Sequence, residues 1–138
     1  MIDIKLLEQL CLCNGISGDE GNVRNLIINE IKDCADDIKT DNLGNLIVFK
    51  KGKKSAKSKL MVSAHMDEVG LMVTDITSDG YLKFDEVGGI DRRVLPGKRV
   101  CVGRNGLNGV IGVKPIHLTN GDEKTAVPKM SDMYIDIG

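Results

Sequence analysis

The sequence predicts a mixed α/β layer over residues 1–67 that passes into a β-rich, barrel-like part over residues 68–138. In the first part, segments with apolar residues at helical spacing alternate with short apolar runs, as in an α/β layer. In the second part, short alternating segments follow one another without helices, as in small β-barrels. Most of the 16 glycines lie in this second part, which indicates many tight turns.

Two helices are expected at the N-terminus. Asp3 can cap a first helix that ends near Gly15. The pattern Ser-x-x-Glu from Ser17 to Glu20 is typical of a capping box, with Ser17 as the N-cap of a second helix that ends near residue 35. The apolar residues of this second helix, at helical spacing, are Val23, Leu26, Ile27, Ile31 and Cys34.

A hairpin and a buried strand are expected next. Residues 38–41 and 46–50 form the two short strands of the hairpin, joined by a turn that contains Asn and Gly. Residues 50–59 contain six lysines and are interpreted as a solvated loop, because no aromatic residues interleave with the charges. The apolar residues 60–64 are expected to form a buried strand that leads directly to His65.

The second part is expected to contain only short strands. Residues 69–76 and 81–87 alternate between apolar and polar side chains around Ser-Asp-Gly, which predicts a β-hairpin. Glycines and Pro96 then separate further short strands, at residues 99–102, 109–113 and 134–137.

His65 and Asp67 carry the clearest chemical signal of the chain. On a strand, side chains two residues apart point to the same face, so an imidazole and a carboxylate would stand side by side. Such a pair presents a metal ligand together with the group that orients it. Sheets of α/β layers build their sites beyond the carboxyl ends of their strands, which is where this pair lies. We therefore expect His65 to bind a divalent metal and Asp67 to support it, although a polar residue without metal fits the spacing as well.

Composition excludes several classes of function. Aromatic residues make up 3% of the chain and Trp is absent, which argues against carbohydrate grooves and base-stacking surfaces. The formal net charge of −1 gives no pull toward nucleic acid or an anionic membrane. No signal peptide or membrane-length apolar run is recognisable, and the four cysteines are expected to be buried thiols in a reducing compartment. A cytoplasmic protein is expected.

The run Ala-His-Met-Asp-Glu-Val-Gly at residues 64–70 resembles the first metal motif of the tetrahedral aminopeptidases, also called glutamyl or leucyl aminopeptidases. The resemblance extends over essentially the whole chain and keeps the family's order. Further matching motifs are Ser-Gly-Asp-Glu at 17–20, Asp-Asn-Leu-Gly-Asn-Leu at 41–46, Val-Gly-Gly-Ile-Asp at 87–91, Gly-Lys-Arg-Val at 97–100, Gly-Val-Ile-Gly-Val-Lys-Pro at 109–115 with His117, and Tyr-Ile-Asp-Ile-Gly at 134–138.

The resemblance implies a dinuclear metallopeptidase that removes N-terminal residues from short peptides with a metal-activated water. It implies an α/β catalytic domain, of which residues 1–67 are the N-terminal part, interrupted by a β-barrel-like dimerisation insertion at residues 68–138. It also implies two zinc or cobalt ions, and dimers that assemble into a dodecamer. By the same resemblance His65 is a metal ligand and Asp67 is the catalytic carboxylate beside it. Glu68 and His117 receive no role in the site.

The chain also departs from the family pattern. The family's later ligands, namely a bridging Asp, a Glu-Glu pair, a further Asp and a distal His, follow the β insertion and match nothing here. Because a catalytic zinc site needs about three protein ligands, we expect the isolated chain to be inactive. Two alternatives stay open: a non-catalytic dimerisation or interaction module, and an endoglucanase, which would need a pair of acid/base carboxylates in an aromatic-lined groove.

Overall fold

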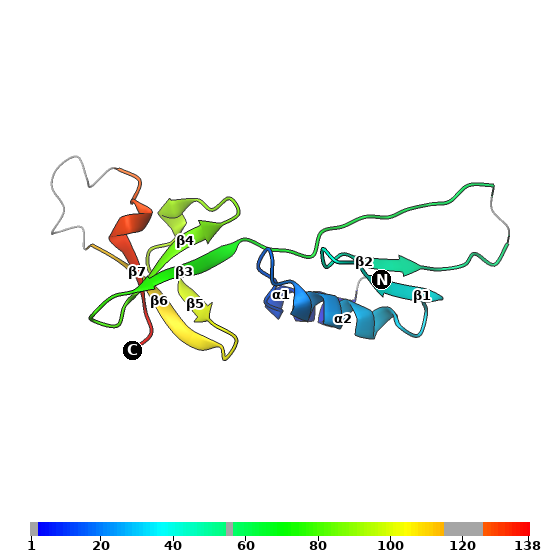
Figure 1. Ribbon diagram of the computed structural model, residues 1–138, viewed down its shortest axis with the longest axis horizontal. Coiled ribbons are helices and arrows are strands. Elements are labelled where there is room, and N and C mark those ends of the chain that lie inside the picture. The colour runs from blue at the N-terminus through cyan, green and yellow to red at the C-terminus, as the bar shows by residue number, and fades with distance from the viewer. Residues whose placement is uncertain (1–2, 55–56, 115–125) are drawn as a thin grey trace. The chain divides into compact units, whose positions relative to one another are not determined.

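The protein is described by a computed structural model that covers residues 3–54, 57–114 and 126–138 (Figure 1). The chain divides into two compact units, Met1–Glu68 and Val69–Gly138. Among the residues that the structure describes, the first contains helices and a small hairpin, and the second contains a single antiparallel sheet. The protein is thus mixed α/β, as the sequence predicts, and each unit is described by itself below.

The first unit begins with helix α1 (Ile4–Leu12), followed by helix α2 (Gly21–Ile31). The Asp3 carboxylate accepts hydrogen bonds from the backbone N–H groups of Lys5, at 3.0 Å, and Leu6, at 3.2 Å. The expected cap of the first helix is therefore confirmed. Helix α2 ends at Ile31, about one turn before the expected position, and residues 32–34 form turns.

The expected capping box at the start of α2 is wrong. Glu20, not Ser17, is the N-cap residue, and no side chain caps the helix. Ile16 and Asp19 close a turn instead, with a 2.8 Å hydrogen bond from Asp19 N–H to the Ile16 carbonyl and Gly18 at φ +92°. The Ser17 hydroxyl is directed away from the helix because it donates to a carboxylate from elsewhere in the unit, as described below.

Strands β1 (Asp37–Thr40) and β2 (Leu46–Phe49) pair antiparallel as the expected hairpin. Asp41 organises the turn, since its carboxylate accepts from the backbone of Leu43 and from the backbone and side chain of Asn45. These bonds, first of all the one from the Asn45 side chain, lower the pKa of Asp41. Arg24 of α2 donates to the Gly44 carbonyl at 2.8 Å and so ties the helix to the hairpin.

The strand expected at residues 60–64 does not form. Leu60, Met61 and Val62 are 90%, 88% and 86% exposed, and Figure 1 shows this segment running past the hairpin without joining it. The described residues of the first unit form a two-stranded sheet, and no described strand pairs with residues 60–64. An apolar run becomes a buried strand only where a neighbouring strand accepts its backbone hydrogen bonds, and no described residue provides one here.

The second unit is a five-stranded antiparallel sheet in the order β3-β4-β7-β6-β5. The predicted hairpin is confirmed by β3 (Gly70–Ile76) and β4 (Leu82–Val87), which pair with a register shift between Val73 and Asp75. The later strands also form, at β5 (Arg99–Val102), β6 (Leu107–Val113) and β7 (Met133–Asp136). Short 3₁₀ turns occupy Arg92–Val94 and Met130–Asp132.

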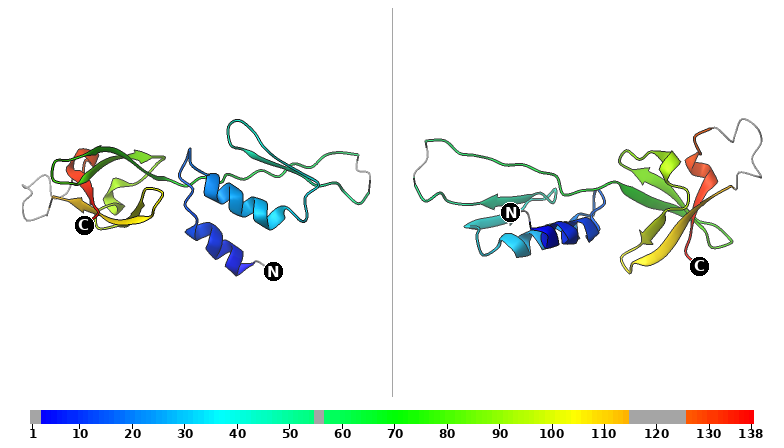
Figure 2. Two further views of the ribbon diagram at one scale, coloured as in Figure 1. Left: turned by 60° about the horizontal axis from the view of Figure 1, so that its bottom comes forward. Right: turned by 180° about the vertical axis from the view of Figure 1, so that it is seen from behind.

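Figure 2 shows that this sheet is curled. One cluster of buried apolar residues forms its core. Among the described residues β3 and β5 do not pair, so the sheet is an open half-barrel. The buried core residues come mainly from β4, β6 and β7: they are Leu82, Phe84, Leu95, Ile111, Met133 and Ile135. In the first unit, by contrast, Val23 is the one buried apolar side chain among the described residues. The apolar core therefore belongs almost wholly to the second unit.

The cysteines are not the buried thiols that the composition suggested. All four lie among the described residues and form no disulfide, but Cys11, Cys34 and Cys101 are exposed and Cys13 is half-buried. The buried part of that expectation is wrong: Cys11 lies on α1, which buries no side chain, and Cys34 and Cys101 lie at exposed positions elsewhere. In the part of the chain that the structure describes, no helix has the length and apolar character required to cross a membrane.

Candidate active site around His65 and Asp67

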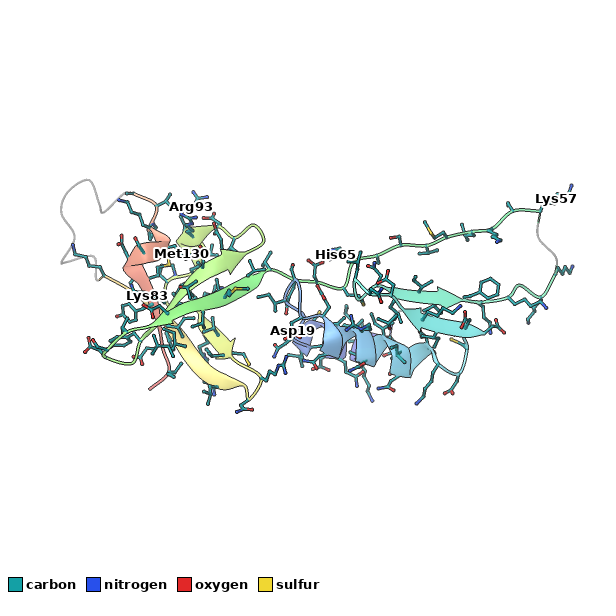
Figure 3. All side chains as sticks on the ribbon, viewed as in Figure 1. Asp19, Lys57, His65, Lys83, Arg93 and Met130 are labelled. Atoms are coloured by element: carbon teal, nitrogen blue, oxygen red, sulfur yellow. The ribbon has the colours of Figure 1, made fainter. Side chains whose placement is uncertain are left out.

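The candidate site lies in the first unit, on the extended segment that carries His65 (Figure 3). This segment is joined to the loop after α1 by a parallel bridge between Ile16 and Glu68. Glu68 N–H donates to the Gly15 carbonyl at 2.8 Å, and Ser17 N–H donates to the Glu68 carbonyl at 3.2 Å. Two parts of the chain that are about 50 residues apart are thereby fixed against each other.

A close backbone approach at Gly15 makes this bridge possible. Gly15 is buried, and a Cβ atom there would lie 2.5 Å from the Val23 side chain and 3.3 Å from the Met66 carbonyl oxygen. Real carbon atoms do not approach to 2.5 Å, so a larger residue would displace either α2 or the segment that carries the site. Glycine at this position is therefore a requirement of the site's geometry.

The His65 ring is held through its Nδ1 atom. Nδ1 lies 2.9 Å from the backbone carbonyl oxygen of Asp67 and 3.0 Å from its Oδ1 atom. A carbonyl oxygen can only accept a hydrogen bond, so Nδ1 must carry the hydrogen. In the neutral ring this leaves the lone pair on Nε2, which is the atom that could bind a metal.

The Asp67 carboxylate is shared between two neighbours. Its Oδ1 atom faces the His65 ring, and its Oδ2 atom accepts a hydrogen bond from the Ser17 hydroxyl at 2.5 Å. The Ser17 hydrogen bond, followed by the one from His65, lowers the pKa of Asp67 below its ordinary value. The carboxylate is therefore ionised at neutral pH, which suits a group that stabilises and orients an imidazole.

Solvent reaches both side chains. The His65 side chain is 85% exposed and the Asp67 side chain is 40% exposed. The imidazole is thus available to a ligand from outside the unit, while the carboxylate is held from behind by Ser17.

These residues fit one ligand position of a metal site. A zinc-binding histidine usually donates a hydrogen bond from its second ring nitrogen to a carboxylate or a carbonyl group. No group of three or more His, Cys, Asp or Glu side chains that could enclose an ion occurs among the residues that the structure describes. His117 lies outside those residues. The described part of the chain therefore offers a prepared ligand and its supporting carboxylate.

The structure brings together the pair expected from the sequence and adds Ser17 to it. The i, i+2 spacing places His65 beside Asp67, although on an exposed extended segment and not at the end of a buried strand. Ser17 was interpreted as a helix cap, and no sequence signal connects it with a residue 50 positions later. Glu68 is exposed and its Oε1 atom accepts a hydrogen bond from Gly15 N–H at 3.3 Å, which is a structural contact.

Comparison with known proteins places this chain in a peptidase family. The sequence model of the M42 glutamyl aminopeptidase family matches residues 44–138 of this chain. A putative aminopeptidase of Acetivibrio thermocellus is 47% identical over 96% of the chain, which spans 38% of that relative. The chain therefore belongs to the M42 glutamyl aminopeptidase family, and it spans less than half the length of this relative.

Solved structures show the same fold. A TET aminopeptidase from the archaeon Thaumarchaeota archaeon SCGC AB-539-E09 superimposes with a TM-score of 0.88 at 34% identity, over 98% of this chain and 38% of its own. The TET1 peptidase of Pyrococcus horikoshii, described as assembling into a tetrahedron or a large octahedral shell, gives 0.81 at 45% identity, over 98% and 40%. A Thermotoga maritima protein described as an endoglucanase gives 0.80 at 45% identity, over 96% and 38%.

Proposed function

We propose that this chain is the N-terminal part of a metal-dependent aminopeptidase that removes N-terminal residues from short peptides. One observation carries the proposal: in a chain of this family, His65 is held through Nδ1 so that Nε2 is open to a ligand. Two divalent ions, zinc or cobalt, would polarise the carbonyl group of the peptide substrate and activate a water molecule when bound. His65 would hold one of them through Nε2.

Asp67 has the supporting role in this proposal. Its carboxylate keeps the hydrogen on Nδ1 and fixes the orientation of the ring as a ligand. Because Asp67 is ionised and fixed by Ser17, the ring needs little reorganisation when a ligand arrives.

We further propose that the half-barrel unit, residues 69–138, serves dimerisation and, through dimers, assembly into a larger shell. Support comes from the similarity to a TET1 peptidase described as forming a tetrahedron or octahedral shell. The second unit has its own core, so it can act as a rigid interface module.

The isolated 138-residue chain is expected to be inactive, since its described residues bring no three metal-binding side chains together. A decisive experiment places the chain in the Acetivibrio thermocellus relative, where it replaces the matching 38%. Hydrolysis of aminoacyl p-nitroanilides by the graft should vanish in His65→Ala and fall about 10–100-fold in Asp67→Asn. Lys57→Ala, on the exposed lysine-rich segment, is the control that should retain activity. Full activity of the His65→Ala graft would refute the proposal.

The endoglucanase description of one similar structure makes a second activity testable. Such an activity needs two carboxylates in a groove lined by aromatic rings, whereas this chain has no Trp, two Tyr and two Phe. We expect the graft to release no reducing sugar from soluble cellulose. Release that a carboxylate substitution abolishes would favour the endoglucanase over the aminopeptidase.

A further inference from the structure

Ser17 reaches the candidate site from a turn whose position is set by the backbone. The Asp19 N–H donates to the Ile16 carbonyl, and Ser17 N–H donates to the Glu68 carbonyl. Gly18 adopts φ +92°, which glycine accepts without strain. None of these contacts involves the Ser17 side chain, so the hydroxyl can be removed while the turn keeps its anchors.

The hydroxyl has no task in the adjacent helix. Helix α2 begins without a side-chain cap, and the Glu20 carboxylate accepts from Gly18 N–H at 2.6 Å. The Ser17 hydroxyl donates instead to Asp67 Oδ2, the oxygen that does not face His65. Its only described hydrogen bond therefore serves the carboxylate of the candidate site.

A carboxylate in this position needs such a restraint. The Asp67 side chain is 40% exposed, so without a partner on Oδ2 it could rotate into water and release the ring. With Ser17 on one oxygen and His65 Nδ1 on the other, the carboxylate is held at both ends. If the carboxylate rotated away, the backbone carbonyl of Asp67 would be the one remaining described acceptor for Nδ1–H.

We propose that Ser17 is a positioning residue that locks the Asp67 carboxylate, and that this lock keeps His65 in the Nδ1–H tautomer with Nε2 ready for a divalent metal. The metal part of this inference rests on the proposed function, whereas the tautomer part does not. Ser17 touches neither metal nor substrate in this inference and acts only through Asp67.

The test compares Ser17→Thr with Ser17→Val, two side chains of the same shape of which only threonine keeps a hydroxyl. The readout is the pair of ring ¹⁵N chemical shifts of His65 in the 138-residue chain, at a pH where the ring is neutral. The chain has two histidines, so a His117→Gln background assigns the signals. Backbone amide spectra of each variant verify that the fold is retained.

We expect the wild-type chain and Ser17→Thr to show the Nδ1–H form, and Ser17→Val to show a clear rise of the Nε2–H form, which unrestrained histidine favours. Equal tautomer populations in the threonine and valine variants would overturn the proposal, because the hydroxyl would then have no effect. A shift in both variants would overturn it too, since packing and not the hydroxyl would hold the site.

A zinc titration of the same samples separates this inference from the proposed function. We expect zinc to perturb His65 Nε2 in the wild type, with an affinity about 10-fold or more weaker in Ser17→Val. Absence of any zinc contact at wild-type His65 would overturn the metal part of this inference, while the tautomer result and the graft assay of the proposed function stand apart from it. Zinc binding of equal strength in both variants would overturn the role of Ser17 in metal binding.

Discussion

Tyr134 lies directly opposite Gly112 in the register of β6 and β7, and its ring covers the glycine. A Cβ atom at Gly112 would lie 2.5 Å from two ring carbons and 2.8 Å from the hydroxyl oxygen. The ring also packs against Tyr81, with 4.7 Å between centroids. An aromatic side chain thus fills the gap that the glycine leaves on this face of the sheet.

Gly112→Ala should destabilise the second unit by about 1–3 kcal/mol, because the methyl group must displace a ring that is already packed. Chemical denaturation followed by tyrosine fluorescence measures the change. Gly89→Ala is the matched control, since nothing lies within 4 Å of its added Cβ, and should change stability by much less. Equal effects of the two substitutions would contradict the packing account.

Met133→Ala should lower the free energy of unfolding by about 2–5 kcal/mol, since it leaves a cavity in the only apolar core described for the second unit. Met133 is 0% exposed, whereas Met72 on β3 is 59% exposed. Met72→Ala therefore removes the same atoms from a site in contact with water and serves as the control. A comparable loss in both variants, measured by thermal unfolding, would show that burial does not govern stability here.

The Asp91 carboxyl is expected to titrate far below its ordinary range. Arg93 donates to both of its oxygens, at 2.6–3.1 Å, and this bonding lowers the pKa of Asp91 from 3.8 to about 2. A lowered folded-state pKa means that the ion pair contributes fully above pH 3.8 and is lost as the pH falls through about 2. A ¹³C titration of the carboxyl carbon measures this directly.

Arg93→Gln should return the pKa of Asp91 toward 3.8, because the charged donor is lost. Arg104→Gln, at an exposed turn of the same unit, should leave the Asp91 midpoint in place. An Asp91 midpoint near 3.8 in the wild type would show that the ion pair does not form in solution.

The two units should differ in protection from hydrogen exchange. The half-barrel buries a cluster of six apolar residues, whereas the first unit buries Val23 alone among its described apolar side chains. Amides of β4, β6 and β7 should therefore exchange only through large openings, and those of α1 should exchange rapidly. Mass spectrometry of exchanged peptides gives the comparison, and equal protection of α1 and β6 would contradict it.

Local features of the fold could be predicted from the sequence. Asp3 caps α1, a turn with Asn and Gly joins β1 to β2, and the Ser-Asp-Gly turn joins β3 to β4, because each depends on residues within a few positions. The prediction of a buried strand at residues 60–64 was wrong because it depends on residues far away in the sequence. The apolar character of residues 60–64 predicts burial, but burial depends on a partner strand, and none of the described strands provides it.

In the candidate site, too, local contacts could be predicted from the sequence and the distant contact could not. His65 and Asp67 are neighbours by spacing, so the pair was predictable. Ser17 was not, because its contact with Asp67 spans 50 residues and its sequence pattern equally fits a helix cap. Only the bridge between Ile16 and Glu68 brings the serine to the carboxylate.

The lysine-rich segment at residues 50–59 directly precedes the exposed apolar run at residues 60–62. Lys57 and Lys59 stand immediately before Leu60, Met61 and Val62, with four further lysines between residues 50 and 54. When two copies approach through this run, their like charges would repel, so we expect the lysines to oppose aggregation. Salt screens such charges, with a Debye length of about 10 Å at 0.1 M and about 3 Å at 1 M. Light scattering should therefore rise with ionic strength. Neutralising the lysines by acetylation should promote self-association through residues 60–62 even at low salt.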